Sequence, residues 1–264
     1  DQPRSRGLGD VYKRQVCKVV GDVVLPAAVP QLLRCLSDAS PRVQYHAAMA
    51  LAKQGDASCG AALVLAVTKV RDGDVFLRHA LIAAMAGSGM ELLPLLTHPD
   101  EAARVAAVVA LRRRGDGAVR RFLHDSSPLV VREAARAIHD DDSMLAAMPE
   151  LAQLLPELDG KDPVLRNDPV VMRRAISANL RCGDAPALAR LARFAAQRTA
   201  DVTLREEALA SLTVALEGVP LDRVEGRYRN IAPVAAEKVV AVFSEHAAAL
   251  LQDPLPRSAV LRVR

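Results

Sequence analysis

The side chains that could do chemistry are scattered along this 264-residue chain. Hydrolases of the serine type expose the nucleophile on a strained turn, with a Gly-x-Ser-x-Gly pattern around it. No serine lies in such a pattern, including Ser58, Ser143, Ser177 and Ser211, and no glycine-rich phosphate loop is present. The sequence therefore predicts no catalytic residue and no bound cofactor.

Metal ligands are equally sparse. His46 and His79 fall at nearly the same phase of two adjacent predicted helices, but no third ligand accompanies them. The acidic run 140–142 lacks the glycine and the distal glutamate of a calcium loop, so we expect a solvated turn that caps a helix starting at Ser143. The four cysteines lack metal-like spacing and are expected to be buried apolar residues, namely Cys17, Cys35, Cys59 and Cys182.

The elements that must position these side chains form a repeat. An apolar residue, then Arg (once Gln), then alanine-rich sequence recurs along the chain, with the polar residue at Gln44, Arg78, Arg104, Arg132, Arg173, Arg205 and Arg262. The alanines allow helices to approach closely, and each unit must stack on its neighbours to bury its apolar face. The arginines are expected to form an internal ladder, in which each lies over the adjacent repeat and reaches a carboxylate or a helix-end carbonyl there.

Two kinds of turn, or corner, separate the helices of the repeat. Gly-Asp follows the repeat helix at Gly55, Gly115 and Gly183, where glycine ends one helix and aspartate caps the next. A capping residue with proline precedes the next repeat helix, as at 126–128 and 168–169. These signals predict an all-α fold, a right-handed α-solenoid of stacked antiparallel helix pairs. Insertions are expected at about 156–169 and 217–253, the second with a loop over 220–227 and an amphipathic stretch over 231–252.

The Asp/Pro turn, the apolar-Arg-x-x-Ala phrase and the Gly-Asp corner together resemble HEAT repeats, and more closely the short bacterial type named after phycobilisome lyases. The resemblance covers roughly residue 26 to the end and implies the solenoid fold. It says little about function, because such repeats occur in many unrelated scaffolds.

One basic stripe is the candidate contact surface. Arg190 and Arg193 share a face of the predicted helix 186–197, and Arg120 with Arg121 lies on the corresponding helix of an earlier repeat. We expect these four residues on the concave wall, where they could contact a partner. Nucleic acid is not expected, because the net charge is +4, aromatics are 3% and Trp is absent. No run is long and apolar enough to span a membrane.

The two ends of the chain differ from the rest. Residues 1–15 resemble a translated sequencing-adapter tail, and we exclude them from fold and function reasoning. The solenoid then covers 16–264 and stops inside a repeat phrase at 261–264, so we expect a fragment that is truncated at its C-terminus.

These observations predict a non-catalytic protein-interaction or domain-spacing scaffold, whose partner is another protein or adjacent domains of the same polypeptide. Two alternatives stay open. The segment 221–227 resembles part of very large bacterial secreted proteins that join a sugar-dehydrogenase-like propeller, HEAT repeats and a cytochrome c, which implies an accessory module of a periplasmic oxidoreductase. The repeat type also resembles bilin lyases, which implies an enzyme with a chromophore groove. The compartment, periplasmic or secreted in the first case and cytoplasmic otherwise, depends on which of these holds.

Overall fold

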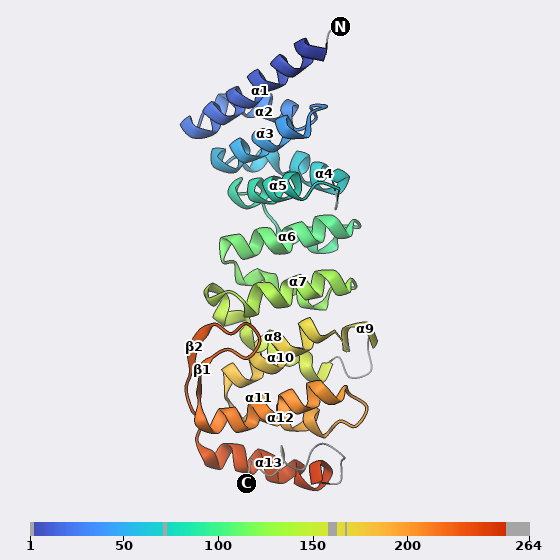
Figure 1. Ribbon diagram of the computed structural model, residues 1–264, viewed down its shortest axis with the longest axis vertical. Coiled ribbons are helices and arrows are strands. Elements are labelled where there is room, and N and C mark those ends of the chain that lie inside the picture. The colour runs from blue at the N-terminus through green and yellow to red at the C-terminus, as the bar shows by residue number, and fades with distance from the viewer. Residues whose placement is uncertain (1–2, 71–72, 158–162, 167, 252–264) are drawn as a thin grey trace. The chain divides into compact units, whose positions relative to one another are not determined.

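The computed structural model describes residues 3–70, 73–157, 163–166 and 168–251 (Figure 1). Two compact units divide the chain at Ala118, and each is a stack of helices. Within the described residues, the only sheet is a two-stranded hairpin. The predicted all-α, solenoid-like fold is confirmed in both units. None of the described helices is both long enough and apolar enough to cross a membrane.

Unit 1 stacks its repeat helices in chain order. α1 (Pro3–Val23) packs on α3 (Pro41–Gln54), α3 on α5 (Val75–Gly87), and α5 on α6 (Glu101–Arg114). The shorter helices α2 (Val29–Cys35) and α4 (Gly60–Val70) pack against this row, α2 on α3 and α4 on both α5 and α6.

Unit 2 continues the same scheme with α7 (Pro128–His139), α10 (Pro169–Cys182) and α12 (Val202–Glu217), in which α10 packs on both α7 and α12. The helices α8 (Met148–Glu157) and α11 (Ala185–Ala196) lie against α10, and the four-residue α9 spans Pro163–Arg166. After α12 come β1 (Val219–Leu221), β2 (Tyr228–Ile231) and α13 (Ala236–Leu251), which packs on α11 and α12.

The corners follow the predicted chemistry. Gly55, Gly115 and Gly183 take the left-handed conformation, with φ of 69°, 64° and 61°, at the ends of α3, α6 and α10. The aspartate after each of them accepts a backbone N–H of the following turn, as Asp184 does from Ala187 at 2.8 Å. These three helices therefore end where glycine fits without strain, and the element after each starts on a capped turn.

The second element of some repeats is shorter than expected. The repeats after α5 and α6 have only the 3₁₀ segments Leu93–Thr97 and Gly117–His124, so Arg120 and Arg121 lie on a 3₁₀ segment and not on an α-helix. Few residues separate the successive repeat helices here, and proline sits inside the first segment at Pro94. A 3₁₀ segment rises further per residue than an α-helix, so it spans the same gap with fewer residues.

Alanine and glycine set the spacing of the helices. The repeat alanines are buried, including Ala107 and Ala135 at 0% exposure. Where α5 crosses α3, an added Cβ on Gly87 would lie 2.0 Å from the carbonyl oxygen of Ala52. The layers thus approach to backbone contact, as the repeat phrase predicts.

Two of the repeat arginines make the contacts expected of an internal ladder. Arg132 donates to Asp168 at 2.7 and 2.9 Å, which ties α7 to the capping residue of α10. Arg205 donates to the carbonyl of Ala195 at 2.9 Å, and Gln44, which replaces arginine, donates to the carbonyl of Asp38 at 2.6 Å. These side chains serve the stack itself.

The second insertion differs from its prediction. The stretch predicted as a loop holds the antiparallel hairpin of β1 and β2, with Leu221 paired to Tyr228, and the amphipathic stretch becomes helical only from Ala236. The hairpin starts at Gly218 with φ of 68°, where a Cβ would lie 2.8 Å from the carbonyl oxygen of Ile231. In the first insertion, residues 158–162 and 167 lie outside the described residues, as does the last phrase at 261–264.

Candidate functional site

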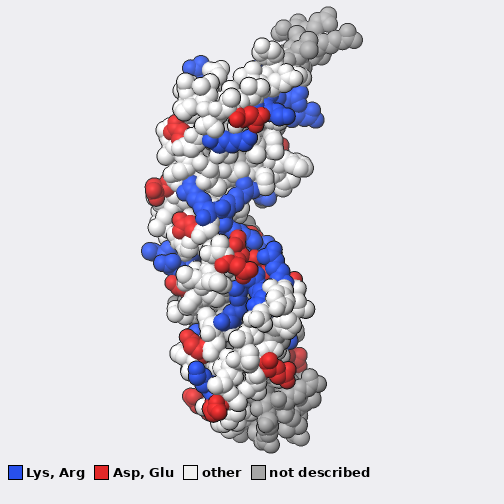
Figure 2. All heavy atoms as spheres, turned by 90° about the vertical axis from the view of Figure 1, so that its left-hand side faces the viewer, with Lys and Arg blue, Asp and Glu red and all other residues white. Residues whose placement is uncertain are grey.

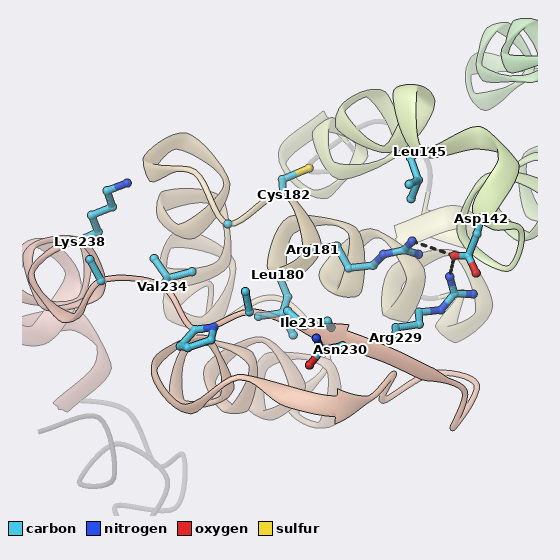
Figure 3. A pocket seen from close by; sticks show the side chains of 14 residues that line it. Asp142, Leu145, Leu180, Arg181, Cys182, Arg229, Asn230, Ile231, Val234 and Lys238 are labelled. Atoms are coloured by element: carbon cyan, nitrogen blue, oxygen red, sulfur yellow. Dashed lines mark hydrogen bonds and ion pairs between the residues drawn. The ribbon is translucent and has the colours of Figure 1, made fainter.

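A hollow of about 590 Å³ lies in unit 2 beside the hairpin (Figure 3). Its walls are the end of α10, the strand β2, the extended segment that follows β2, and the first turn of α13. The apolar lining includes Leu145, Leu180, Ile231 and Val234, and the polar lining includes Asp142, Arg181, Cys182, Arg229, Asn230 and Lys238.

Local geometry holds these walls together. The segment after β2 runs along α12, where the N–H of Val234 donates to the carbonyl of Ala215 at 2.6 Å. A Cβ on Gly183 would lie 3.3 Å from the Val234 side chain, so the corner after α10 and this segment are in contact distance. The insertion therefore forms one wall of the hollow, and the repeat helices form the other.

Charged side chains converge at one end of the hollow. Arg181 from α10 and Arg229 from β2 both point at Asp142, as Figure 3 shows. Arg229 also pairs with Glu225 at 2.7 Å, and its side chain is only 4% exposed. Lys238 lies exposed at the opposite end, on α13. The arginines are thus neutralised by hairpin and turn carboxylates, while the lysine is displayed to solvent.

A buried polar cluster links the hairpin to the helices. His139 ends α7, Ser177 lies in the middle of α10, and Asp222 follows β1. The Ser177 Oγ is 2.9 Å from His139 Nε2 and 3.2 Å from Asp222 Oδ2. The other ring nitrogen of His139, Nδ1, is 2.9 Å from Asp140 Oδ1. Residues from three distant parts of the chain meet here.

These distances resemble a serine–histidine–carboxylate triad, but the electrostatics differ. Burial alone lowers the pKa of His139, yet its hydrogen bonds to Asp140 and Asp222 outweigh burial and raise that pKa. Burial would raise the pKa of Asp140, but hydrogen bonds from His139 and Arg174 lower it to about 2. The pKa of Asp222 is likewise lowered, against burial, by His139 and by backbone N–H groups. A raised pKa favours the protonated imidazole, and a protonated imidazole cannot take the proton of Ser177.

The burial of the cluster also argues against catalysis. His139 is 0% exposed, Asp222 1% and Ser177 5%, so no substrate atom reaches the hydroxyl without opening the hairpin. The cluster is best described as a clasp, the His139–Ser177–Asp222 clasp, that fastens the hairpin onto α7 and α10.

The same region contains the candidate metal ligands. His139, Asp222 and Glu225 offer ligand atoms within 4.8 Å of one another. The guanidinium of Arg229 already faces both carboxylates, at 2.7 Å from Glu225 and 3.8 Å from Asp222. A divalent cation would have to displace this guanidinium and the proton on His139, so the donor set suits an ion-pair network better than a metal.

Cys182 is the thiol of the hollow. Its pKa is raised by burial and by the nearby charge of Asp184, against the opposing effect of Arg190 and Arg181. The protonated thiol is a poor nucleophile at neutral pH, so Cys182 contributes an apolar surface.

The four arginines that the sequence predicts on a partner surface lie outside the hollow. Arg120 pairs with Glu150 at 3.1 Å, and Arg190 donates to the side chain of Asn179 at 2.7 Å, whereas Arg121 and Arg193 are exposed. None of the four lines the hollow. On the face drawn in Figure 2, basic and acidic side chains are interspersed. Their role as contacts stays a prediction.

The other sequence candidates have structural partners. His46 stacks edge-on against Tyr45, and His79 contacts Arg113 at 3.0 Å. Asp141 caps the turn at Ser143, as predicted, but its neighbours Asp140 and Asp142 belong to the charge network and not to a merely solvated turn. Sequence reasoning missed the clasp, whose only signal was a polar insertion next to a repeat array.

Comparison with known proteins supports the repeat architecture. Residues 10–86 match the family model of HEAT repeats. An engineered protein of known crystal structure is 16% identical, with a TM-score of 0.46 over 96% of this chain and 74% of that chain. The complex of CpcE and CpcF of phycocyanin lyase from Nostoc sp. PCC7120 is 19% identical, with a TM-score of 0.34 over 91% of this chain and 89% of that chain. No curated protein matches the sequence. The chain is thus a helical-repeat protein whose first part is similar to HEAT repeats.

Proposed function

We propose that this chain is a non-catalytic protein-interaction scaffold, and that the hollow of unit 2 receives a segment of its partner. The observation that carries the proposal is the make-up of the hollow. Its lining is mixed: apolar side chains lie between an exposed lysine at one end and neutralised arginines at the other. A concave site that combines apolar surface with placed polar groups can orient a bound segment.

The partner segment is expected to be apolar with an acidic residue. Leu145, Ile231 and Val234 would contact its apolar side chains, and Lys238 would meet its carboxylate. Arg193 on α11 remains a candidate for a second, outer contact with the same acidic partner. Because exposed charges are screened within about 10 Å at 0.1 M salt, such binding should weaken as salt is added.

The clasp supports a binding role over catalysis. The serine–histidine pair of this region is buried, and hydrogen bonds to two carboxylates raise the pKa of its imidazole, which favours the protonated form. The group therefore stabilises the wall of the hollow and does not supply a nucleophile.

Site-specific photo-crosslinking tests the proposal. A photoreactive amino acid replaces Lys238 at the hollow, and the control places it at Ser244, an exposed position on a different face of α13. The proposal expects a defined partner to be crosslinked from position 238 and not from position 244. The affinity of that partner, measured by calorimetry, should fall in Lys238→Glu, Ile231→Asp and Arg193→Glu, and stay unchanged in Arg112→Glu.

Two results would refute it. One is a partner whose affinity is indifferent to Lys238→Glu and Ile231→Asp. The other is a reaction on that partner that is catalysed by the wild-type chain and lost in Ser177→Ala while the fold is retained.

A further inference from the structure

A groove of unit 1 brings together two of the chain's few aromatic side chains. Its volume is about 340 Å³, and it lies between the beginnings of α3 and α5, which pack on each other in successive layers (Figure 1). Tyr45 comes from α3 and Phe76 from α5, in a chain that has only three tyrosines, four phenylalanines and no tryptophan. The other lining residues are Pro41, Arg42, His46, Asp74 and Leu77. We call this site the Tyr45–Phe76 groove, and because all of it lies in unit 1 it is a different site from the hollow.

The aromatic rings of the groove are displayed to solvent. Phe76 is 77% exposed, whereas Leu77 beside it is buried and belongs to the core. The Oδ1 of Asp74 accepts the N–H groups of Phe76 and Leu77 at 3.0 and 2.9 Å, so the cap of α5 fixes the backbone that carries the exposed ring. Tyr45 is half-buried, and its ring meets the ring of His46 edge-on, with 5.3 Å between their centroids. Aromatic side chains that gather in a groove, unlike scattered ones, are typical of a contact surface.

The polar side chains of the groove mainly offer hydrogen-bond donors. Arg42 is exposed, and in the part of the chain that the structure describes neither its guanidinium nor the Tyr45 hydroxyl has a hydrogen bond or an ion pair. The carboxylate of Asp74 already caps α5. A ligand that fits the groove should therefore bring apolar surface and hydrogen-bond acceptors, and a carboxylate would match Arg42.

We propose that the Tyr45–Phe76 groove binds an extended, proline-containing segment of a partner protein, with an acidic residue beside the prolines. A proline residue has a carbonyl acceptor and no N–H donor, so its backbone suits the donors of Tyr45 and Arg42. Proline-rich segments adopt the polyproline II helix before they bind, and they dock in grooves that are lined by aromatic side chains. The acidic residue of the segment would pair with Arg42.

Single-stranded nucleic acid also stacks on aromatic side chains, but it fits this groove less well. Its phosphates would approach the carboxylate of Asp74, and among the described lining residues Arg42 is the only arginine or lysine. The proposal is independent of the function proposed for unit 2, because none of the residues it uses lines the hollow.

The test is fluorescence anisotropy with the full chain and two labelled peptides. One peptide repeats Pro-Pro-Glu, and the matched peptide repeats Ala-Ala-Glu, which keeps the charge and loses the prolines. We expect saturable binding of the proline peptide, and an affinity about tenfold lower for the alanine peptide.

Three variants locate the binding site. Phe76→Ala should lower the affinity for the proline peptide about tenfold, and Tyr45→Phe, which keeps the ring and removes the hydroxyl, should lower it about threefold. The matched control Tyr228→Ala removes a ring that is 73% exposed on β2 and should leave the affinity unchanged. Because the Phe76 side chain is mostly exposed, its removal should leave the helical spectrum and the urea midpoint as in the wild type.

Several results would overturn the proposal. The first is a wild-type chain that shows no saturable binding of the proline peptide at millimolar concentration, or that binds both peptides alike. The second is an affinity for the proline peptide that survives Phe76→Ala, which would place the contact elsewhere. The third is a labelled oligothymidylate that binds more tightly than the proline peptide and is lost in Phe76→Ala, which would assign the groove to single-stranded nucleic acid.

Discussion

The clasp offers the sharpest test of how unit 2 holds its hairpin. Asp222→Asn keeps the size of the side chain, and the amide oxygen can still accept the backbone N–H groups of Val224 and Glu225, which lie 2.8 and 3.0 Å from Oδ1. The substitution therefore removes a charge and leaves the turn. His139 and Arg229 lose a buried counter-ion, at 3.4 and 3.8 Å.

The magnitude follows from burial. Removing one partner of a buried ion pair costs about 3–5 kcal/mol. Here His139 keeps Asp140, and Arg229 keeps Glu225 and Asp142, so the loss should lie at or below the lower end of that range, about 2–3 kcal/mol. The control Asp184→Asn alters an exposed helix cap, where asparagine serves as well as aspartate, and should change nothing.

Hydrogen exchange across the hairpin and urea unfolding are the two assays. Two backbone amides report on the turn: the N–H of Asp222 donates to the carbonyl of Arg227 at 2.7 Å, and the N–H of Gly226 donates to the carbonyl of residue 222 at 2.8 Å. Both amide hydrogens should exchange faster in Asp222→Asn than in the control. If the variant loses less than about 1 kcal/mol, the value of an exposed pair, then the clasp does not hold the hairpin and our reasoning is wrong.

The pH dependence has a defined sign. The pKa of His139 is raised in the folded state, so its contribution is fully present below about 6.5 and is lost as pH rises through the folded pKa. The pKa values of Asp140 and Asp222 are lowered, so their contribution is present above about 4 and is lost as pH falls through the folded values. The groups that face the imidazole are Asp140, Asp222 and the guanidinium of Arg181. The stability lost between about pH 6.5 and the folded pKa should be smaller in Asp222→Asn, because His139 has lost one of its two carboxylates.

Three further predictions concern the stack. Ala107→Leu and Ala135→Leu should each destabilise by about 1–3 kcal/mol in urea unfolding, because these alanines are fully buried between helices and extra methylenes force the layers apart; unchanged midpoints would contradict the packing. Val24→Gly should stabilise unit 1 by about 1 kcal/mol, since Val24 has φ of 46°, a left-handed conformation that a β-branched residue adopts only under strain; a lower midpoint would show that the Val24 side chain matters more than its backbone. Deletion of residues 1–15 should leave the melting temperature unchanged, because the described contact of that segment with Asp38, through Lys13, is exposed; a clear drop would show that the segment belongs to the fold.

Sequence alone determined what depends on short-range spacing. The repeat phrase, the Gly-Asp corners and the buried alanines are properties of neighbouring residues, so the repeat helices and their order could be predicted from them. The sequence also indicated that repeat arginines reach a neighbouring carboxylate or carbonyl, but not which one. The insertions at about 156–169 and 217–253 stay predictions, drawn from an interruption of the period, which is itself a local signal.

Tertiary structure alone decided what the chain brings together over long distances. His139, Ser177 and Asp222 lie 38 and 45 residues apart along the chain, and nothing local marks any of them. Their meeting depends on the hairpin folding back over α7 and α10, and the hairpin begins at Gly218, where a Cβ would lie 2.8 Å from the carbonyl oxygen of Ile231. The raised pKa of His139 and the walls of the hollow likewise come from packing, since burial and the distance between charges do not exist until the layers have stacked.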